Sequence, residues 1–328
     1  MREIEPRTWR CLRWLTSITA LIATSVVAQT FPTKPISLVV SFSPGGVTDI
    51  VARMLAEPLG KELGQPVIVE NVPGAGGNVA FVKIANAAPD GYSLLLASTS
   101  TVTNPALQKD SRFDPVKSYA PIGFVGAIPF WMLVNPAKSD LTTVAKLVEK
   151  AHHGGSKLTY GSGGVGTASH LGPEYFKFTE QASILHIPYK GQSAAVTDLL
   201  AGTVDMVYMP VSGTEDLVRS GKLKALATTS QSRLAGFADV PSFAEAGFPK
   251  MDVGGWLGLV APAGTPAPIA DRIGKALNKI LAQPEFRAKL AERGMEARIT
   301  EPVEFGHYIE REVMRWRDLV AKTGIRAE

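Results

Sequence analysis

Two glycine-containing turns carry the residue types best suited to holding a small anion. Each follows a short apolar run typical of a buried strand and precedes a run with helical spacing. Glycine lets a ligand approach the backbone closely, and a helix N-terminus offers N–H groups at the positive end of its dipole. The first clamp turn comprises Ser43, Pro44, Gly45, Gly46 and Val47, and the second comprises Ser162, Gly163, Gly164, Val165, Gly166 and Thr167.

Further residues beside these turns are candidates for ligand contact. Asp49 either touches the ligand or braces its turn, and bracing is the favoured interpretation because a free carboxylate would repel an anion. Thr48 or Asp49 is expected to cap the helix that follows. His170, in the first turn of the helix after the second clamp turn, either contacts ligand or packs against the loop. The remaining candidates are Ser98, Thr99 and Ser100, which follow a third strand, together with Asp205 and Met209.

Other chemistries fit the sequence less well. Gly161, Gly163 and Gly166 match G-x-G-x-x-G, but the acidic residue that a dinucleotide site needs does not close the next strand. No metal-ligand spacing appears, and we expect neither a metal nor a cofactor. An exported hydrolase would have to use Ser162 with His170, since His186 and His307 look isolated. A plain turn without any ligand is the simplest alternative.

The elements that position the turns alternate between strand and helix. Strands are expected at residues 36–42, 67–70 and 92–97, with helices between them, and a second such unit spans residues 157–228. Residues 119–135 predict one extended passage, interrupted at Pro129, that carries the chain between two bodies. The pattern predicts an α/β protein of two lobes joined by a hinge, with residues 29–129 plus 250–328 in the first lobe and 130–249 in the second.

The N-terminus predicts export. Residues 1–28 combine four arginines, an apolar stretch and a small-residue cleavage site, as in a secretory signal peptide, and an uncleaved membrane anchor is the alternative. The single cysteine, Cys11, lies in this segment, so the mature chain would form no disulfide. Cleavage lowers the formal charge from +4 to +2, because it removes four arginines and two glutamates. This charge is too small for a nucleic-acid-binding protein. Because of the signal peptide, we expect the mature protein to be periplasmic.

Taken in order, the motifs resemble those of the substrate-binding proteins of tripartite tricarboxylate transporters, the Bug family of periplasmic solute receptors. The matching segments cover nearly all of the mature chain. They are residues 31–36, Pro44-Gly45-Gly46 with Asp49, 64–67 through 70–71, 73–78, 89–92, Gly161-Ser162 with 166–167 and 170–171, 188–191, Gly202 with Asp205, 239–241 with 245–247, and 261–266.

The resemblance implies a type II-like Venus-flytrap fold that closes on a small organic carboxylate and is not an enzyme. It implies that the two clamp turns act as a pincer, with residues 98–100 nearby, and that the protein is a monomer serving the permease subunits of a membrane transporter. A receptor that reports to a signalling partner is the other possibility. The sequence departs from the family pattern at residues 207–210 and after the third strand, and Met209 could favour a less polar ligand.

Overall fold

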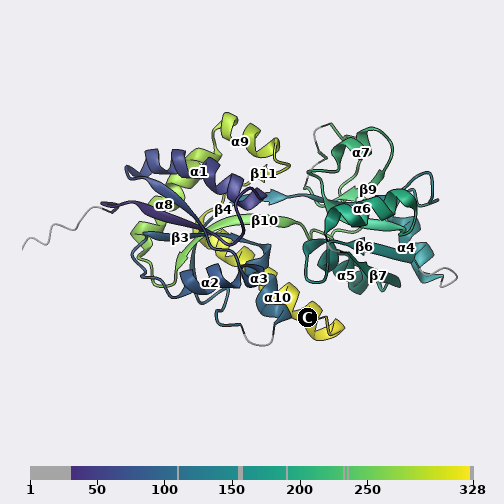
Figure 1. The fold of residues 1–328 in the computed structure, drawn as a ribbon, viewed down its shortest axis with the longest axis horizontal. Coiled ribbons are helices and arrows are strands. Elements are labelled where there is room, and N and C mark those ends of the chain that lie inside the picture. Colours follow the sequence, from purple (N-terminus) through teal and green to yellow (C-terminus); the bar gives the residue numbers. More distant parts are fainter. Residues whose placement is uncertain are drawn as a thin grey trace, which may run out of the picture.

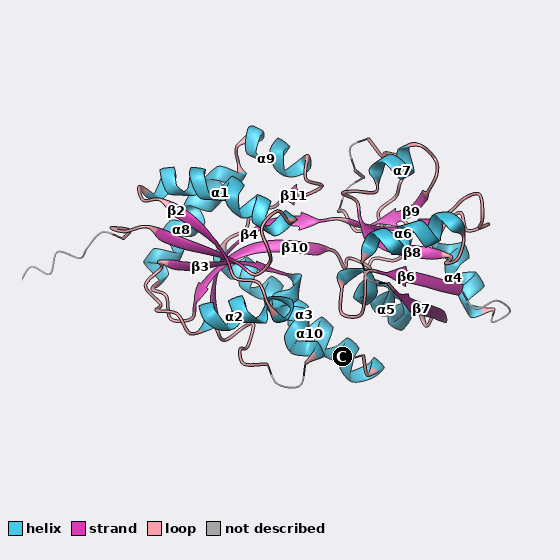
Figure 2. Ribbon diagram, viewed as in Figure 1, coloured by secondary structure: helices cyan, strands magenta, loops and turns pink. Residues whose placement is uncertain are grey.

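A computed structural model describes residues 31–108, 111–153, 158–189, 191–231, 233–234 and 236–325, so the expected signal peptide lies outside the described part. The chain forms two α/β lobes side by side, joined near the middle of the molecule (Figure 1). Each lobe has one sheet with helices around it (Figure 2). None of the described helices has both the length and the apolar character that crossing a bilayer requires.

The first lobe is built on a six-stranded sheet in the order β11-β4-β10-β3-β1-β2. Strands β1, β2 and β3 are parallel, whereas β10 runs antiparallel to both β3 and β4. The strands are β1 (Ile36–Val40), β2 (Val67–Asn71), β3 (Ser93–Ser98), β4 (Tyr119–Ile128), β10 (Gly255–Pro262) and β11 (Glu296–Ala297).

Helices cover both faces of this sheet. Alternate residues of β1 point to opposite faces, so Leu38 joins one apolar cluster with Leu55, and Val39 joins another with Phe81. This two-sided burial explains why the strand is a continuous apolar run in the sequence. The helices are α1 (Val47–Leu63), η1 (Ala75–Gly77), α2 (Asn78–Ala85), α3 (Thr99–Leu107), α8 (Ala267–Leu281), α9 (Pro284–Ala291) and α10 (Pro302–Thr323).

The second lobe has a five-stranded sheet in the order β7-β6-β8-β5-β9. Its strands are β5 (Phe130–Val134), β6 (Leu158–Ser162), β7 (Ile184–Pro188), β8 (Met206–Pro210) and β9 (Lys224–Thr228). Its helices are α4 (Val144–His152), α5 (Ala168–Glu180), α6 (Gln192–Ala201) and α7 (Glu215–Arg219).

Two crossings of the chain join the lobes. The first is Pro129, between β4 and β5, as the extended passage predicted, and the second lies between β9 and β10. They run side by side, since Phe130 N–H donates to Thr229 Oγ1 at 2.9 Å and Thr229 N–H donates to the Phe130 carbonyl at 2.8 Å. The exact limits of the two domains remain a prediction.

Strand directions bring the carboxyl edges of the two sheets to the hinge. Strand β4 points the same way as β3, because both pair antiparallel with β10, and it ends at Ile128 beside the first crossing. In the second lobe Phe130, which begins β5, pairs with Pro210, which ends β8, and β6 is parallel to β8 and β7. Loops after β1 and β6 therefore lie at edges that face the other lobe.

Two local elements lie where the sequence pattern predicted none. Residues 99–107 form helix α3, directly after the third strand. Glu296–Ala297 form the short strand β11, which pairs with β4 and so covers the edge of the first sheet.

Candidate functional site

The first clamp turn projects from the carboxyl end of β1 and is exposed along its length, from Ser43 to Val47. Gly45 has φ = +88°, a conformation that glycine adopts readily, so the sharp reversal depends on it. Gly46 is the N-cap of α1 and supplies no side-chain capping bond. The first N–H groups of α1, which have no partner inside the helix, therefore face outward uncapped. The expected caps, Thr48 and Asp49, both lie inside the helix.

Asp49 braces the first clamp turn. Its Oδ2 accepts the Gly45 N–H at 2.9 Å, and its carboxylate pairs with the Arg53 guanidinium at 3.0 Å. Asn71, at the end of β2, donates to Asp49 Oδ1 at 2.9 Å and to the Phe42 carbonyl at 3.0 Å. The Arg53 hydrogen bonds, followed by the one from Gly45, lower the pKa of Asp49 to about 2. Because its negative charge is held by these donors, the carboxylate leaves the turn open to an anion.

The start of α3 lies at the same edge as the first clamp turn. Ser98, the last residue of β3, is buried, and its N–H donates to Thr101 Oγ1 at 3.2 Å. Thr99 and Ser100 are half-buried, and Thr99 Oγ1 accepts the Trp256 N–H at 3.1 Å. This contact ties α3 to β10 where β10 leaves the hinge, so at least Thr99 has a structural role.

The second clamp turn is fixed by its own hydrogen bonds. Ser162 has no exposed surface, and its Oγ accepts the Gly164 N–H at 3.1 Å. Gly163 N–H donates to Ser169 Oγ at 2.9 Å, and Thr167 Oγ1 donates to the Gly164 carbonyl at 2.7 Å. Several donors that we expected to face a ligand are thus already used within the turn, which defines a rigid shape.

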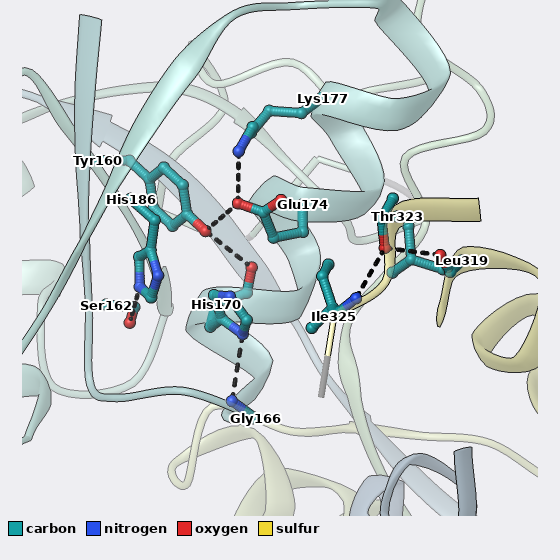
Figure 3. A network of polar contacts seen from close by, with 10 residues as sticks. All are labelled: Tyr160, Ser162, Gly166, His170, Glu174, Lys177, His186, Leu319, Thr323 and Ile325. Atoms are coloured by element: carbon teal, nitrogen blue, oxygen red, sulfur yellow. Dashed lines mark hydrogen bonds and ion pairs between the residues drawn. The ribbon is translucent and has the colours of Figure 1, made fainter. Parts of the chain in front are cut away.

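Two histidines form hydrogen bonds with residues of the second clamp turn (Figure 3). His170 Nδ1 accepts the Gly166 N–H at 3.1 Å, and His186 Nε2 lies 2.7 Å from Ser162 Oγ. The two rings lie with centroids 4.3 Å apart. His170 is buried, so it packs and holds the loop. His186 was expected to be isolated, and that expectation was wrong.

A buried carboxylate, Glu174, lies beside the histidines and holds the side chains around them. The Glu174 carboxylate accepts bonds from the Tyr160 hydroxyl and the Lys177 ammonium, each at 2.6 Å (Figure 3). The Tyr160 ring stacks on His186 with centroids 4.7 Å apart. Burial, and then the nearby His170, lower the pKa of His186 to about 4. His186 is therefore neutral near pH 7, and the second clamp turn is held without a charge at Ser162.

The serine–histidine pair does not form the catalytic arrangement considered for a hydrolase. The partner of Ser162 is His186 and not His170, whose Nδ1 already accepts a backbone N–H. Since Ser162 is completely buried, its hydroxyl is out of reach of a substrate. The pair acts as a brace.

Asp205 and Met209 lie at opposite ends of β8. Asp205 precedes the strand, where its Oδ2 accepts the N–H and hydroxyl of Thr159 at 2.8 and 2.9 Å. That position is at the edge away from the hinge, so the structure does not bring Asp205 to the clamp turns. Met209 lies near the carboxyl end and is buried. It also lines a cavity of about 330 Å³, together with Gln192, Ser193, Val196, Pro210, Ser212, Gly213 and Thr214.

This cavity adjoins the second clamp turn and the interface between the lobes. A Cβ on Gly163 would lie 2.9 Å from Gln192 Cγ, and one on Gly294 of the first lobe would lie 2.6 Å from Ser212 Cβ. A Cβ on Gly166 would lie 3.7 Å from Leu107 Cδ1, at the end of α3. The second clamp turn and its cavity therefore directly adjoin the first lobe.

Comparison with known proteins agrees with this arrangement. Protein BugT of Bordetella pertussis is 36% identical over 310 residues, which cover 93% of this chain and 94% of the relative. The structure of the periplasmic binding protein BugD matches with a TM-score of 0.70 and 35% identity, over 91% of this chain and all of that chain.

Two further structures contain carboxylates. Rpa4515 of Rhodopseudomonas palustris with adipate matches with a TM-score of 0.72 and 29% identity, over 90% of this chain and 99% of that one. MatC of the same organism with bound malate matches with a TM-score of 0.69 and 29% identity, over 88% of this chain and all of that one.

A family model described as the tripartite tricarboxylate transporter family receptor matches residues 51–325. This span includes most of both lobes, and the Bug relatives match over nearly the whole chain. The chain therefore belongs to the receptors of the tripartite tricarboxylate transporter family, which are solute-binding proteins of the periplasm and not enzymes.

Proposed function

We propose that this protein captures a small organic carboxylate between its two clamp turns and delivers it to the permease of a tripartite transporter. The observation that carries the proposal is the exposed, uncapped N-terminus of α1 at the hinge-facing edge of the first lobe. Such a terminus offers backbone donors to an anion, and Asp49 does not oppose the anion because its charge is held by Arg53.

The two clamp turns would have different roles in binding. The first would donate N–H groups to one carboxylate of the ligand, and the second would close over it as a rigid wall. Neither turn contains a lysine or arginine, so affinity would come from preplaced neutral donors and exclusion of water. Binding would favour the closed form because only there would the ligand touch both turns.

The remote end of the ligand would extend toward the cavity beside Met209. Its walls mix hydroxyl and amide groups with the apolar Val196, Met209 and Pro210. Such a lining suits a chain with apolar carbons and at most a few polar atoms. Adipate and malate in the related structures are both small dicarboxylates, which supports this size class.

The direct test is a panel of mono-, di- and tricarboxylates measured by thermal shift and then by calorimetry on the purified protein. We expect at least one member to raise the melting temperature and to bind with a measurable Kd. Binding should weaken in Asp49→Asn and not in Asp216→Asn, an exposed carboxylate on α7. If no carboxylate stabilises the protein and none co-purifies with it, the proposal fails.

Delivery and location need separate measurements. Mass spectrometry of the protein from a periplasmic extract should find an N-terminus near residue 29, and the full-length chain in the membrane fraction would indicate an anchor instead. Capture of a tripartite permease by the liganded protein would support delivery. Capture of a sensor protein in place of the permease would favour a signalling receptor.

A further inference from the structure

A second cavity, of about 170 Å³, lies at the hinge itself. Both crossings line it, through Ile128 and Pro129 on one side and Thr229, Ser230, Gly254 and Gly255 on the other. Figure 1 shows the edge strand β11 beside this junction. The side chains that complete the lining with polar or aromatic groups are Phe124, Gln231, Asp252, Glu296, Arg298 and Tyr308.

Most of the charges around this hinge cavity are already paired. Asp252 pairs with Arg315 at 2.6 Å, and Arg298 pairs with Glu304 at 3.1 Å. Glu296 differs, because no ion pair is recorded for it among the described residues, and its carboxylate bonds to Ser230 on the second crossing. Glu296 is half-buried, and that burial raises its pKa. One carboxylate in the cavity wall thus has no cationic partner within the part of the chain that the structure describes.

The aromatic side of the cavity provides an apolar wall. The Arg298 guanidinium carbon lies 5.4 Å from the Phe124 ring centroid and 6.0 Å from that of Tyr308, so a cation already occupies a face of each ring. The charged end of an occupant would therefore lie toward Glu296, and Phe124 would contact its carbon atoms. The volume of 170 Å³ corresponds to about five or six water molecules at ~30 Å³ each, which matches a molecule of about four to six non-hydrogen atoms.

We propose that the hinge cavity binds a small organic ammonium ion, with Glu296 as its counter-ion and Phe124, Ile128 and Pro129 against its carbon atoms. This site is separate from the clamp turns, and only its coupling to them rests on the proposed function. The bound ion would touch both crossings at once. Since lobe movement must bend both crossings, an occupant that fits one degree of bending better would change the affinity of the clamp turns for their ligand.

Direct binding is tested on the wild-type protein without any carboxylate. n-Propylammonium chloride should raise the melting temperature at millimolar concentration, relative to sodium chloride at the same ionic strength. n-Propanol, which has the same number of non-hydrogen atoms and no charge, should not. Equal stabilisation by both probes, or by neither, would overturn the proposal without reference to what the clamp turns bind.

Substitution of Glu296 tests whether n-propylammonium binds in the hinge cavity. Glu296→Gln should weaken n-propylammonium binding by about tenfold or more, as expected for the loss of one charge-assisted hydrogen bond. Glu149→Gln, an exposed residue of α4 at the far side of the second lobe, should leave it unchanged. Unaltered binding in Glu296→Gln would refute the assignment, even if the ammonium ion binds elsewhere.

The coupling is measured by titrating a carboxylate from the panel with and without n-propylammonium, again in the wild type and Glu296→Gln. A change in carboxylate Kd that is present in the wild type and absent in the variant supports a hinge effector site. Equal carboxylate Kd values in the wild type with and without the saturating ammonium ion would contradict the coupling.

Discussion

The two clamp turns have similar sequences and are held in place in different ways. The first is exposed and is braced from one side by the carboxylate of Asp49, whose pKa is about 2. The second is held by neutral hydroxyls and imidazoles, and the buried Ser162 forms its base. The first clamp turn can offer backbone N–H groups to a ligand because Asp49 leaves the N-terminus of α1 uncapped. In the second clamp turn, N–H groups such as that of Gly163 are already hydrogen-bonded within the turn. A glycine turn in a sequence thus marks a candidate binding site but does not tell which of the two turns has N–H groups left for a ligand.

The largest effect is expected at the first turn. Asp49→Asn removes the negative charge that holds Gly45 N–H and Arg53, so the turn should lose its open shape. We expect carboxylate binding to weaken by about ten- to a hundredfold, equivalent to roughly 1.5–3 kcal/mol, in calorimetry. Glu57→Gln, which removes the exposed partner of Lys61 on the same helix, is the matched control and should bind normally. Binding in Asp49→Asn as tight as in Glu57→Gln would show that the turn needs no brace.

A smaller loss of affinity is expected at the second turn. Ser162→Ala deletes the acceptor for Gly164 N–H and leaves His186 without its partner. The free energy of unfolding should fall by about 1–2 kcal/mol in urea titration, with a weaker effect on Kd than Asp49→Asn. Thr197→Ala, which removes an exposed hydroxyl bond on α6, serves as the control. If Ser162→Ala abolished ligand binding while stability was unchanged, Ser162 would be a ligand residue.

Acid should loosen the two turns in different pH ranges. The pKa of His186 falls from 6.5 to about 4 in the folded protein, so the unfolded chain binds the extra proton first and stability declines between about pH 6.5 and 4. Asp49 has a pKa lowered from 3.8 to about 2, so its contribution is lost only between about pH 4 and 2. Urea titrations should show a smaller first decline in His186→Asn than in the wild type, because only His170, whose pKa burial also lowers, remains to contribute to it. The groups facing His186 are His170, Glu174 and Lys177, and they also shape the curve.

The smallest effect concerns ligand choice. Met209→Leu preserves apolar volume and should change stability by less than about 1.5 kcal/mol. If the cavity beside the second turn receives the remote end of the ligand, the variant should change the ratio of the Kd values for carboxylates of different chain length, by less than about tenfold. Unchanged Kd ratios across the panel would show that this cavity does not take part in ligand selection.

Much of the fold could be predicted because alternating strands and helices leave strong local patterns. The two lobes, the parallel strands and the interruption at Pro129 all followed from runs of neighbouring residues. Helix α3 was not predicted because it begins with a Ser-Thr-Ser-Thr run and contains Pro105, both of which disfavour a helix. Strand β11 was not predicted because two residues are too few to show a strand pattern. Their structure is imposed by packing against β3, β4 and β10.

The two clamp turns and the bracing role of Asp49 were predictable from the sequence, whereas Arg53, Asn71 and His186 were not. Glycine and serine mark both turns, but Arg53, Asn71 and His186 act across strands or along a helix. The contacts are set by sheet register: β1 pairs with β2 so that Val40 meets Asn71, and β6 pairs with β7 so that Tyr160 meets His186. A polar residue at the end of a predicted neighbouring strand is the signal that could have found them.

The paired crossings at the hinge also have a mechanical consequence. A single connecting strand would let the lobes rotate freely about it, whereas two strands joined by Phe130 and Thr229 resist torsion and bend mainly about one axis. The lobes would then have essentially one degree of freedom, and each swing would return the turns to the same alignment without a rotational search.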